Sequence, residues 1–77
     1  MPLAATPVRD ALDSAMIPLT AAGCENPRLD AEVLLAAALG IDRLTLITDS
    51  RRDVTGPAAR VFRDFVRRRL EDQAGGA

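Results

Sequence analysis

The sequence contains no histidine, lysine, tryptophan or tyrosine, and its one cysteine is Cys24. A single cysteine cannot form an internal disulfide. Without histidine, the chain also lacks the usual ligands of a zinc site and the Cys–His or Ser–His pair of nucleophilic catalysis. The carboxylates are scattered, and the five glycines do not form a phosphate-binding loop. We therefore expect no catalytic, cofactor-binding or metal-binding residue in this chain.

Long apolar runs are also missing from the sequence. No run approaches the roughly 20 residues that cross a bilayer. The first residues do not combine a basic stretch with a following apolar one, as a secretory signal does. The sequence therefore predicts a cytoplasmic protein without a membrane partner. Cys24 is then expected to be a partly buried, small apolar residue.

Aliphatic residues are abundant: 48% of the 77 residues are hydrophobic, and only Phe62 and Phe65 are aromatic. Such a composition favours close packing of helices over a sheet. A core of this size typically gives about 3–5 kcal/mol of net stability. The chain is therefore expected to form one small domain, over residues 1–73.

All ten basic residues are arginine, and they are unevenly distributed although the net charge is only -1. Residues 1–50 hold three arginines against seven acids, and residues 51–77 hold seven against four. A GC-rich genome is one explanation, because it favours arginine codons. The alternative is selection for bidentate recognition of carboxylate or phosphate. The small net charge gives the whole molecule no strong attraction to nucleic acid.

The first expected helix follows Thr6-Pro7, which resembles an N-cap followed by proline at the first helical position. Gly23 is expected to end it in the left-handed conformation. Pro18 interrupts the pattern and predicts either a kink or two short helices. Together with the alanine-rich second helix, this kink could leave an apolar groove open for another domain. The expected buried stripe consists of Val8, Leu12, Ala15, Leu19 and Ala22.

The second expected helix begins at Asn26-Pro27 and ends at Gly40, with Asp30 favourably placed in its first turn. Every residue from Val33 to Leu39 is apolar, as in a helix that others surround. Ile41 is expected to pack back on the last turn, as in the Schellman motif. We therefore predict that this is the central helix.

Two further helices are expected in the second half of the chain. Asp42 is expected to cap a short helix that ends near Asp49-Ser50. Thr55 is expected to cap the last helix, which starts near Gly56-Pro57. Residues 51–55 connect them, with some extended or single-turn character. Residues 74–77 read as a flexible tail or linker stub. The predicted fold is all-α, a small bundle of four to five short helices. The stripe of the last helix consists of Ala58, Val61, Phe62, Phe65, Val66 and Leu70.

Arg60, Arg63 and Arg67 are spaced by three and four residues, so they share one face of the last helix. They are the candidate partner-binding residues, for an acidic protein surface or for phosphate. The alternative is an ordinary solvated face, with Arg68 and Arg69 stabilising the helix C-terminus. No aromatic residue is interleaved on this face, so binding of single-stranded nucleic acid is not expected.

The segment from Asn26 to Glu32 reads NPRLDAE, and Arg28 can pair with Glu32 across one helical turn. Together with Val33-Leu34-Leu35-Ala36 and Leu39-Gly40, it resembles the "SPRLDAELLLA…LG" stretch of the release-factor glutamine methyltransferases, the HemK/PrmC family. Agreement extends over roughly residues 8–70. The signature positions, which look structural, are Pro27, Arg28, Leu29, Asp30, Glu32, Leu34, Leu35 and Gly40.

The resemblance implies a function for the chain. The family transfers a methyl group from S-adenosylmethionine to a glutamine of bacterial peptide-chain release factors. Its cofactor and its Asn-Pro-Pro-Tyr motif belong to a C-terminal Rossmann-like domain, and that motif does not occur in these 77 residues. The chain is thus expected to be the N-terminal substrate-recognition domain, inactive alone. Its expected partners are the release factor and the methyltransferase domain of the same parent protein.

A function of another class is also compatible with the sequence. The chain could be a free-standing helical adaptor that acts through Arg60, Arg63 and Arg67. Binding of nucleic acid by the same face is a weaker third reading, which predicts an affinity that falls steeply with salt.

Overall fold

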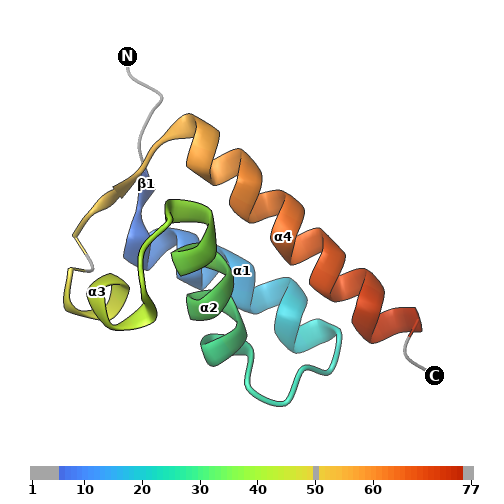
Figure 1. The fold of residues 1–77 in the computed structure, drawn as a ribbon. Helices are drawn as coiled ribbons and strands as arrows, with labels where there is room; N and C mark the ends of the chain where they lie inside the picture. Colours follow the sequence, from blue (N-terminus) through green and yellow to red (C-terminus); the bar gives the residue numbers. More distant parts are fainter. Residues whose placement is uncertain (1–5, 50, 76–77) are drawn as a thin grey trace.

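The computed structural model describes residues 6–49 and 51–75. Over these residues it contains α1 (Val8–Ala21), α2 (Pro27–Leu39), α3 (Arg43–Thr48) and α4 (Gly56–Gly75). Two short strands, β1 (Thr6–Pro7) and β2 (Asp53–Val54), precede α1 and α4 (Figure 1). The predicted all-α fold class is confirmed, with one addition, the small two-stranded ladder. The expected helix end at Ser50 and the tail residues Gly76 and Ala77 lie outside the described residues.

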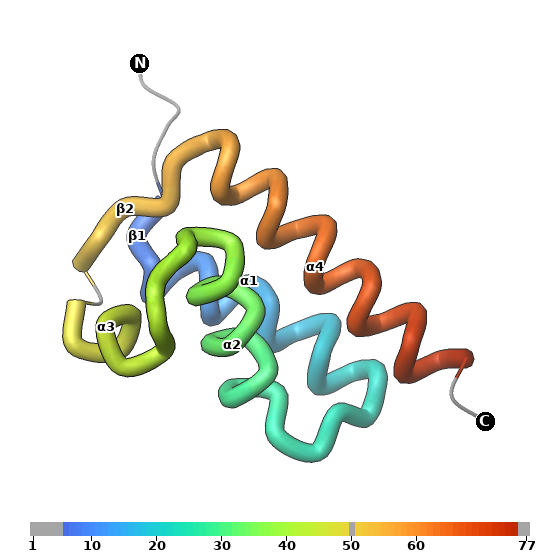
Figure 2. Tube along the Cα trace, in the orientation of Figure 1, coloured from blue at the N-terminus to red at the C-terminus, as the bar shows by residue number. Residues whose placement is uncertain are grey.

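Helix α2 lies at the centre of the bundle, as predicted, because it packs against α1, α3 and α4. Helix α4 is one long, uninterrupted helix that lies alongside the layer formed by α1 and α2 (Figure 2). The core consists of one cluster to which every helix contributes. Leu19, Leu35, Leu46, Val8 and Val54 are its largest fully buried side chains. Cys24 is buried in the same cluster, as predicted.

Helix α1 begins differently from the prediction. Thr6 and Pro7 form β1, and Pro7 occupies the N-cap position without a side-chain hydrogen bond. The expected cap by Thr6 is therefore wrong. The helix continues through Pro18 as a single element, which excludes two short helices. It ends as predicted at Gly23, whose φ is +85°. The amides of Gly23 and Cys24 donate to the carbonyls of Thr20 and Leu19, which is the Schellman pattern.

Helix α2 follows its local sequence closely. Pro27 is its first residue, and the Asn26 Oδ1 accepts a hydrogen bond from the Leu29 amide at 3.3 Å. At its end Gly40 is left-handed, and the Ile41 amide donates to the Ala36 carbonyl at 3.0 Å. Both boundaries and the Schellman motif are thus confirmed.

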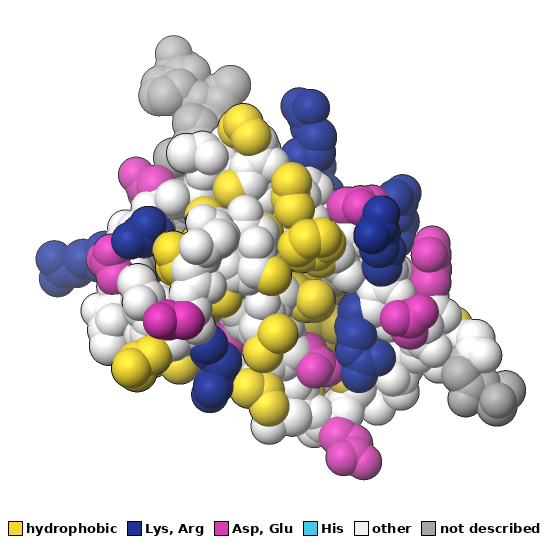
Figure 3. Space-filling model, in the orientation of Figure 1, with side chains coloured by type: hydrophobic (Ala, Val, Ile, Leu, Met, Phe, Trp, Pro, Cys, Tyr) yellow, Lys and Arg dark blue, Asp and Glu magenta, His cyan; other side chains and the backbone are white. Residues whose placement is uncertain are grey.

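The expectation that other helices surround α2 is only partly right. Ala31, Leu35 and Ala36 are buried, but the Val33 side of the helix faces solvent, with 49% of Val33 exposed. Figure 3 shows hydrophobic side chains gathered over the face formed by α2 and α4. An apolar run therefore does not imply burial all round in a bundle with so few helices.

Replacing Gly40 with alanine is expected to lower the free energy of unfolding by about 1 kcal/mol, because φ is +73° there. Gly56→Ala is the matched control, since an added Cβ meets nothing within 4 Å at either position and Gly56 lacks a positive φ. Urea unfolding followed by circular dichroism measures both. Equal effects of the two substitutions would show that the left-handed backbone is not what requires glycine.

A short clasp joins the beginnings of α1 and α4. Strands β1 and β2 pair antiparallel, with Thr6 opposite Val54, and the Val8 amide donates to the Arg52 carbonyl at 2.9 Å. The extended character expected for residues 51–55 is confirmed. The sequence did not predict the pairing with β1, because two residues are too few to show the alternation of apolar and polar side chains that marks a strand.

Helix α3 is capped as predicted by Asp42, whose Oδ1 accepts from the Thr45 amide at 2.8 Å. Hydrogen bonds from the Thr45 side chain and backbone lower the pKa of Asp42. Leu46 is the fully buried residue of this helix, whereas Leu44 and Ile47 are exposed. A single leucine therefore attaches α3 to the core.

Helix α4 begins at Gly56, where the Thr55 carbonyl accepts from the Ala59 amide at 2.8 Å. Phe62 and Val66 are buried as expected, but Val61 is 40% exposed, so its assignment to the buried stripe is wrong. The helix continues to Gly75, into the segment expected as a tail. Arg68 and Arg69 consequently lie before the last turn, and their expected role at the helix C-terminus is wrong.

Candidate protein-docking surface

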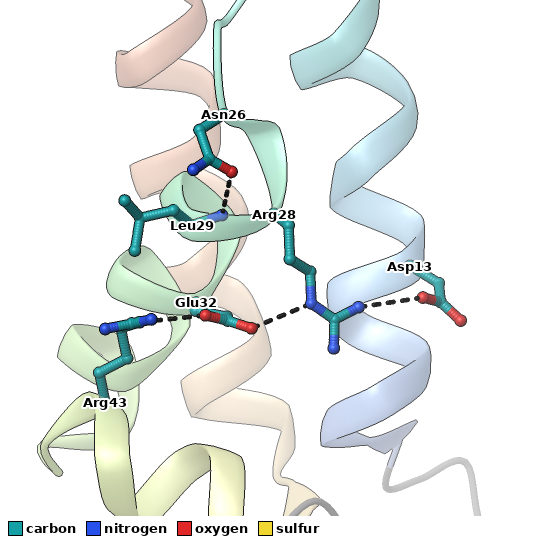
Figure 4. Close-up of polar contacts among 6 residues, drawn as sticks. All are labelled: Asp13, Asn26, Arg28, Leu29, Glu32 and Arg43. Carbon is teal, nitrogen blue, oxygen red and sulfur yellow. Dashed lines mark hydrogen bonds and ion pairs between the residues drawn. The ribbon is translucent and has the colours of Figure 1, made fainter.

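The charged residues of the NPRLDAE segment hold α2 in place. Glu32 is only 8% exposed and accepts hydrogen bonds from two arginines (Figure 4). The Nε atoms of Arg28 and Arg43 both lie 3.0 Å from its carboxylate oxygens. The predicted Arg28–Glu32 pair is thus confirmed. Arg43, which precedes Leu44 in α3, is a second partner that sequence spacing did not reveal.

Two opposing effects act on the ionisation of Glu32. Burial by itself would raise the pKa of the carboxyl group, because it penalises the charged form. The hydrogen bonds and positive charges of Arg28 and Arg43 outweigh burial, so the pKa lies below its ordinary value. Glu32 is therefore ionised at neutral pH, and its negative charge stabilises the fold by pairing with the two arginines.

Two further contacts extend this network to the remaining helices. Arg28 also approaches Asp13 of α1, with 3.7 Å between its Nη1 and a carboxylate oxygen. Asp30 lies 3.4 Å from the Nη2 of Arg69, which belongs to α4. The charged signature residues thus contact α1, α3 and α4 from one helix, and each is engaged within the fold.

The apolar signature residues have different positions. Leu35 is fully buried and Leu34 packs against the edge of the core. Leu29 is 37% exposed. Pro27 and Gly40 mark the two ends of α2. Most of the segment thus positions α2 within the bundle and is engaged in contacts of the fold.

The arginine face of α4 lies apart from this network. Arg60, Arg63 and Arg67 are exposed and line one shallow hollow together with Val61 and Asp64. Arg67 forms an ion pair with Asp64, which Arg68 also approaches. Arg60 and Arg63 pair with no acid among residues 6–49 and 51–75. The predicted face therefore exists, and two of its three cations have no intramolecular acidic partner in the described chain.

Beside this face runs a groove of about 230 Å³ between α1 and α4. Arg63 contributes to both surfaces, and Val54 lies at the end formed by the clasp. The groove expected near Pro18 thus lies against α4 and not against α2. The sequence pattern that could have indicated this groove is the spacing of small residues on α1 by three and four positions. The lining consists of Thr6, Ala11, Ser14, Ala15, Pro18, Val54, Ala59, Phe62, Arg63 and Val66.

In residues 6–49 and 51–75, no three His, Cys, Asp or Glu side chains come together in a way that could hold a metal ion. None of the helices described is both long and apolar enough to cross a membrane. The arginine face and the adjoining groove are the features best suited to a macromolecular partner.

Comparison with known proteins gives two matches. The family model of the PrmC N-terminal domain matches residues 10–73. The chain is also similar to the release factor glutamine methyltransferase of Rhodopirellula baltica, with 47% identity over 49 residues. That alignment covers 64% of this chain but only 17% of the relative. No solved structure matches the chain.

Proposed function

This chain belongs to the PrmC N-terminal domain family, and on that premise we propose that it is the substrate-recognition module of a release factor glutamine methyltransferase. The family match over residues 10–73 carries the proposal. The relative from Rhodopirellula baltica is itself named a release factor glutamine methyltransferase. The module binds a bacterial peptide-chain release factor in the cytoplasm and acts in translation termination.

Methyl transfer itself is assigned to a different part of the parent protein. The aligned region is 17% of the relative, which leaves most of that protein for S-adenosylmethionine binding and catalysis. The Asn-Pro-Pro-Tyr motif that the resemblance implies for catalysis does not occur in this sequence. The chain therefore contributes binding and orientation, and its second partner is the methyltransferase domain.

The recognition role is tested by titrating isotopically labelled chain with an unlabelled bacterial release factor and following the amide shifts. We expect shifts confined to one face of the bundle, because the charged signature residues are already engaged inside the fold. An unrelated acidic protein of similar size is the control. If the release factor causes no shift at high concentration, recognition by this chain is wrong and the free-standing adaptor becomes the better reading.

The assignment of catalysis is tested separately. The chain, S-adenosylmethionine and the release factor are incubated together, and methylation of the release factor is measured by mass spectrometry. We expect none. Methylation by the chain alone would contradict the assignment without affecting the result of the binding experiment.

A further inference from the structure

We propose that the α1–α4 groove binds an amphipathic helical segment of the release factor, with acidic side chains beside its apolar ones. The inference rests on the proposed function and adds to it the surface used and the chemistry of the segment. Three features of the groove carry it: its apolar floor, the charge on the α4 wall and the lack of charged lining residues on the α1 wall.

The floor of the groove is made of side chains that also belong to the core. Phe62, Val66 and Val54 contribute from α4 and the clasp, and Ala11 and Ala15 from α1. The groove exists because the α1 side chains are too small to fill the space up to α4. Its volume of about 230 Å³ lies below the roughly 300–1,000 Å³ of small-molecule sites. The space suits a few apolar side chains of a helix laid between two helices.

The α4 wall supplies the charge. Arg63 is the charged residue among those that line the groove, and Arg60 lies one turn before it. Neither forms an ion pair within the described residues, whereas Arg67, one turn later, is held by Asp64. Carboxylates on the incoming helix gain charge-assisted hydrogen bonds here, and a basic helix is repelled. Charge complementarity therefore selects an acidic segment.

The α1 wall contributes no charged side chain to the lining of the groove. Pro18 has no N–H group to donate to the Ser14 carbonyl, and both residues line the groove. Ser14 is the polar residue that α1 contributes to the lining, and Arg63 lines the groove from α4. The difference in charge between the two walls orients the bound helix, with its acidic side chains toward α4.

The same titration with a release factor locates the surface of this chain that the release factor covers. The amides of Ser14, Ala15, Phe62 and Arg63 are expected to shift most. Shifts centred on α3 or on the exposed side of α2 would leave the proposed function standing and overturn the groove. No shifts at all would overturn both. Movement of the groove amides when the chain alone is concentrated would identify the occupant as a second copy, which also overturns the proposal.

Substitutions make the test quantitative. Arg63→Glu removes the charge on the wall, and Ser14→Leu narrows the groove at an exposed helical position where leucine favours folding. Each is expected to weaken the affinity for the release factor by about tenfold. Arg51→Glu is the matched control, because it makes the same charge change at an exposed site without an ion pair in the described chain. It is expected to change the affinity by less than about twofold.

Two outcomes of this series would contradict the proposal. Equal weakening by Arg63→Glu and Arg51→Glu would show general electrostatic attraction without a groove. Unchanged affinity of Ser14→Leu would show that no side chain enters between α1 and α4. Circular dichroism of each variant verifies that the helical fold is retained.

Discussion

Leu35→Ala is expected to leave much of the chain unfolded at room temperature. Leu35 is 0% exposed and lies in the middle of α2, the helix that contacts the other three. Truncating a buried leucine to alanine costs about 2–5 kcal/mol, through lost transfer energy and the cavity left behind. A domain of this size has about 3–5 kcal/mol in total. The substitution therefore removes most of the available stability.

Thermal and urea unfolding followed by circular dichroism measure this effect. Leu44→Ala is the matched control, because Leu44 is 71% exposed and its truncation should cost less than about 0.5 kcal/mol. Leu35→Met, which nearly conserves volume, should cost less than about 1.5 kcal/mol and keep the protein folded. A fully folded Leu35→Ala protein would mean that α2 is not the main source of stability.

The second large effect is expected from Glu32→Gln, at about 1–2 kcal/mol near neutral pH. Glutamine keeps the shape of the side chain but removes its negative charge. One of the two charge-assisted hydrogen bonds becomes weaker, and at the other the glutamine NH₂ group faces an arginine N–H, so that two donors meet. The estimate is moderate because about half of each arginine side chain is exposed to solvent, which screens the interaction.

The contribution of the Glu32 carboxylate to the stability of the fold must decrease as the pH falls. The pKa of Glu32 is lower in the folded chain than its ordinary value, so the folded state favours the ionised form. Its stabilisation is complete above the unfolded pKa of about 4.3 and is lost as the pH falls through the lower, folded value. The stability difference between the original chain and Glu32→Gln should therefore shrink in acid.

Urea unfolding at a series of pH values from 7 to 3 tests this dependence. Glu71→Gln is the control, since Glu71 is exposed and forms no ion pair in the described part of the chain. A stability difference for Glu32→Gln that stays constant with pH would show that the ionised carboxylate is not responsible.

The elements that could be predicted from the sequence are those specified by neighbouring residues. Asn26-Pro27 and Gly40 define both ends of α2, because capping and the left-handed turn depend on a few adjacent groups. Asp42 defines the beginning of α3 in the same way. The Arg28–Glu32 pair was predictable for the same reason, since four residues along a helix bring two side chains together.

Features that depend on distant residues could not be predicted in this way. The pairing of Thr6 with Val54, and of Asp30 with Arg69, joins residues that only the finished fold brings together. Helical spacing placed Val61 on the buried stripe, but which flank of α4 is covered depends on where α2 lies. The candidate groove shares this property, because its two walls come from opposite ends of the chain.

The clasp between β1 and β2 has a consequence for the order of folding. Contacts within α1, α2 and α3 form between near neighbours, whereas Thr6 must wait for Val54 and Ala11 for Phe62. Closing such a long loop costs entropy before any contact offsets it. During synthesis, which proceeds from the N-terminus, the first three helices can leave the ribosome without a finished groove. The proposed docking groove is thus completed only when α4 emerges.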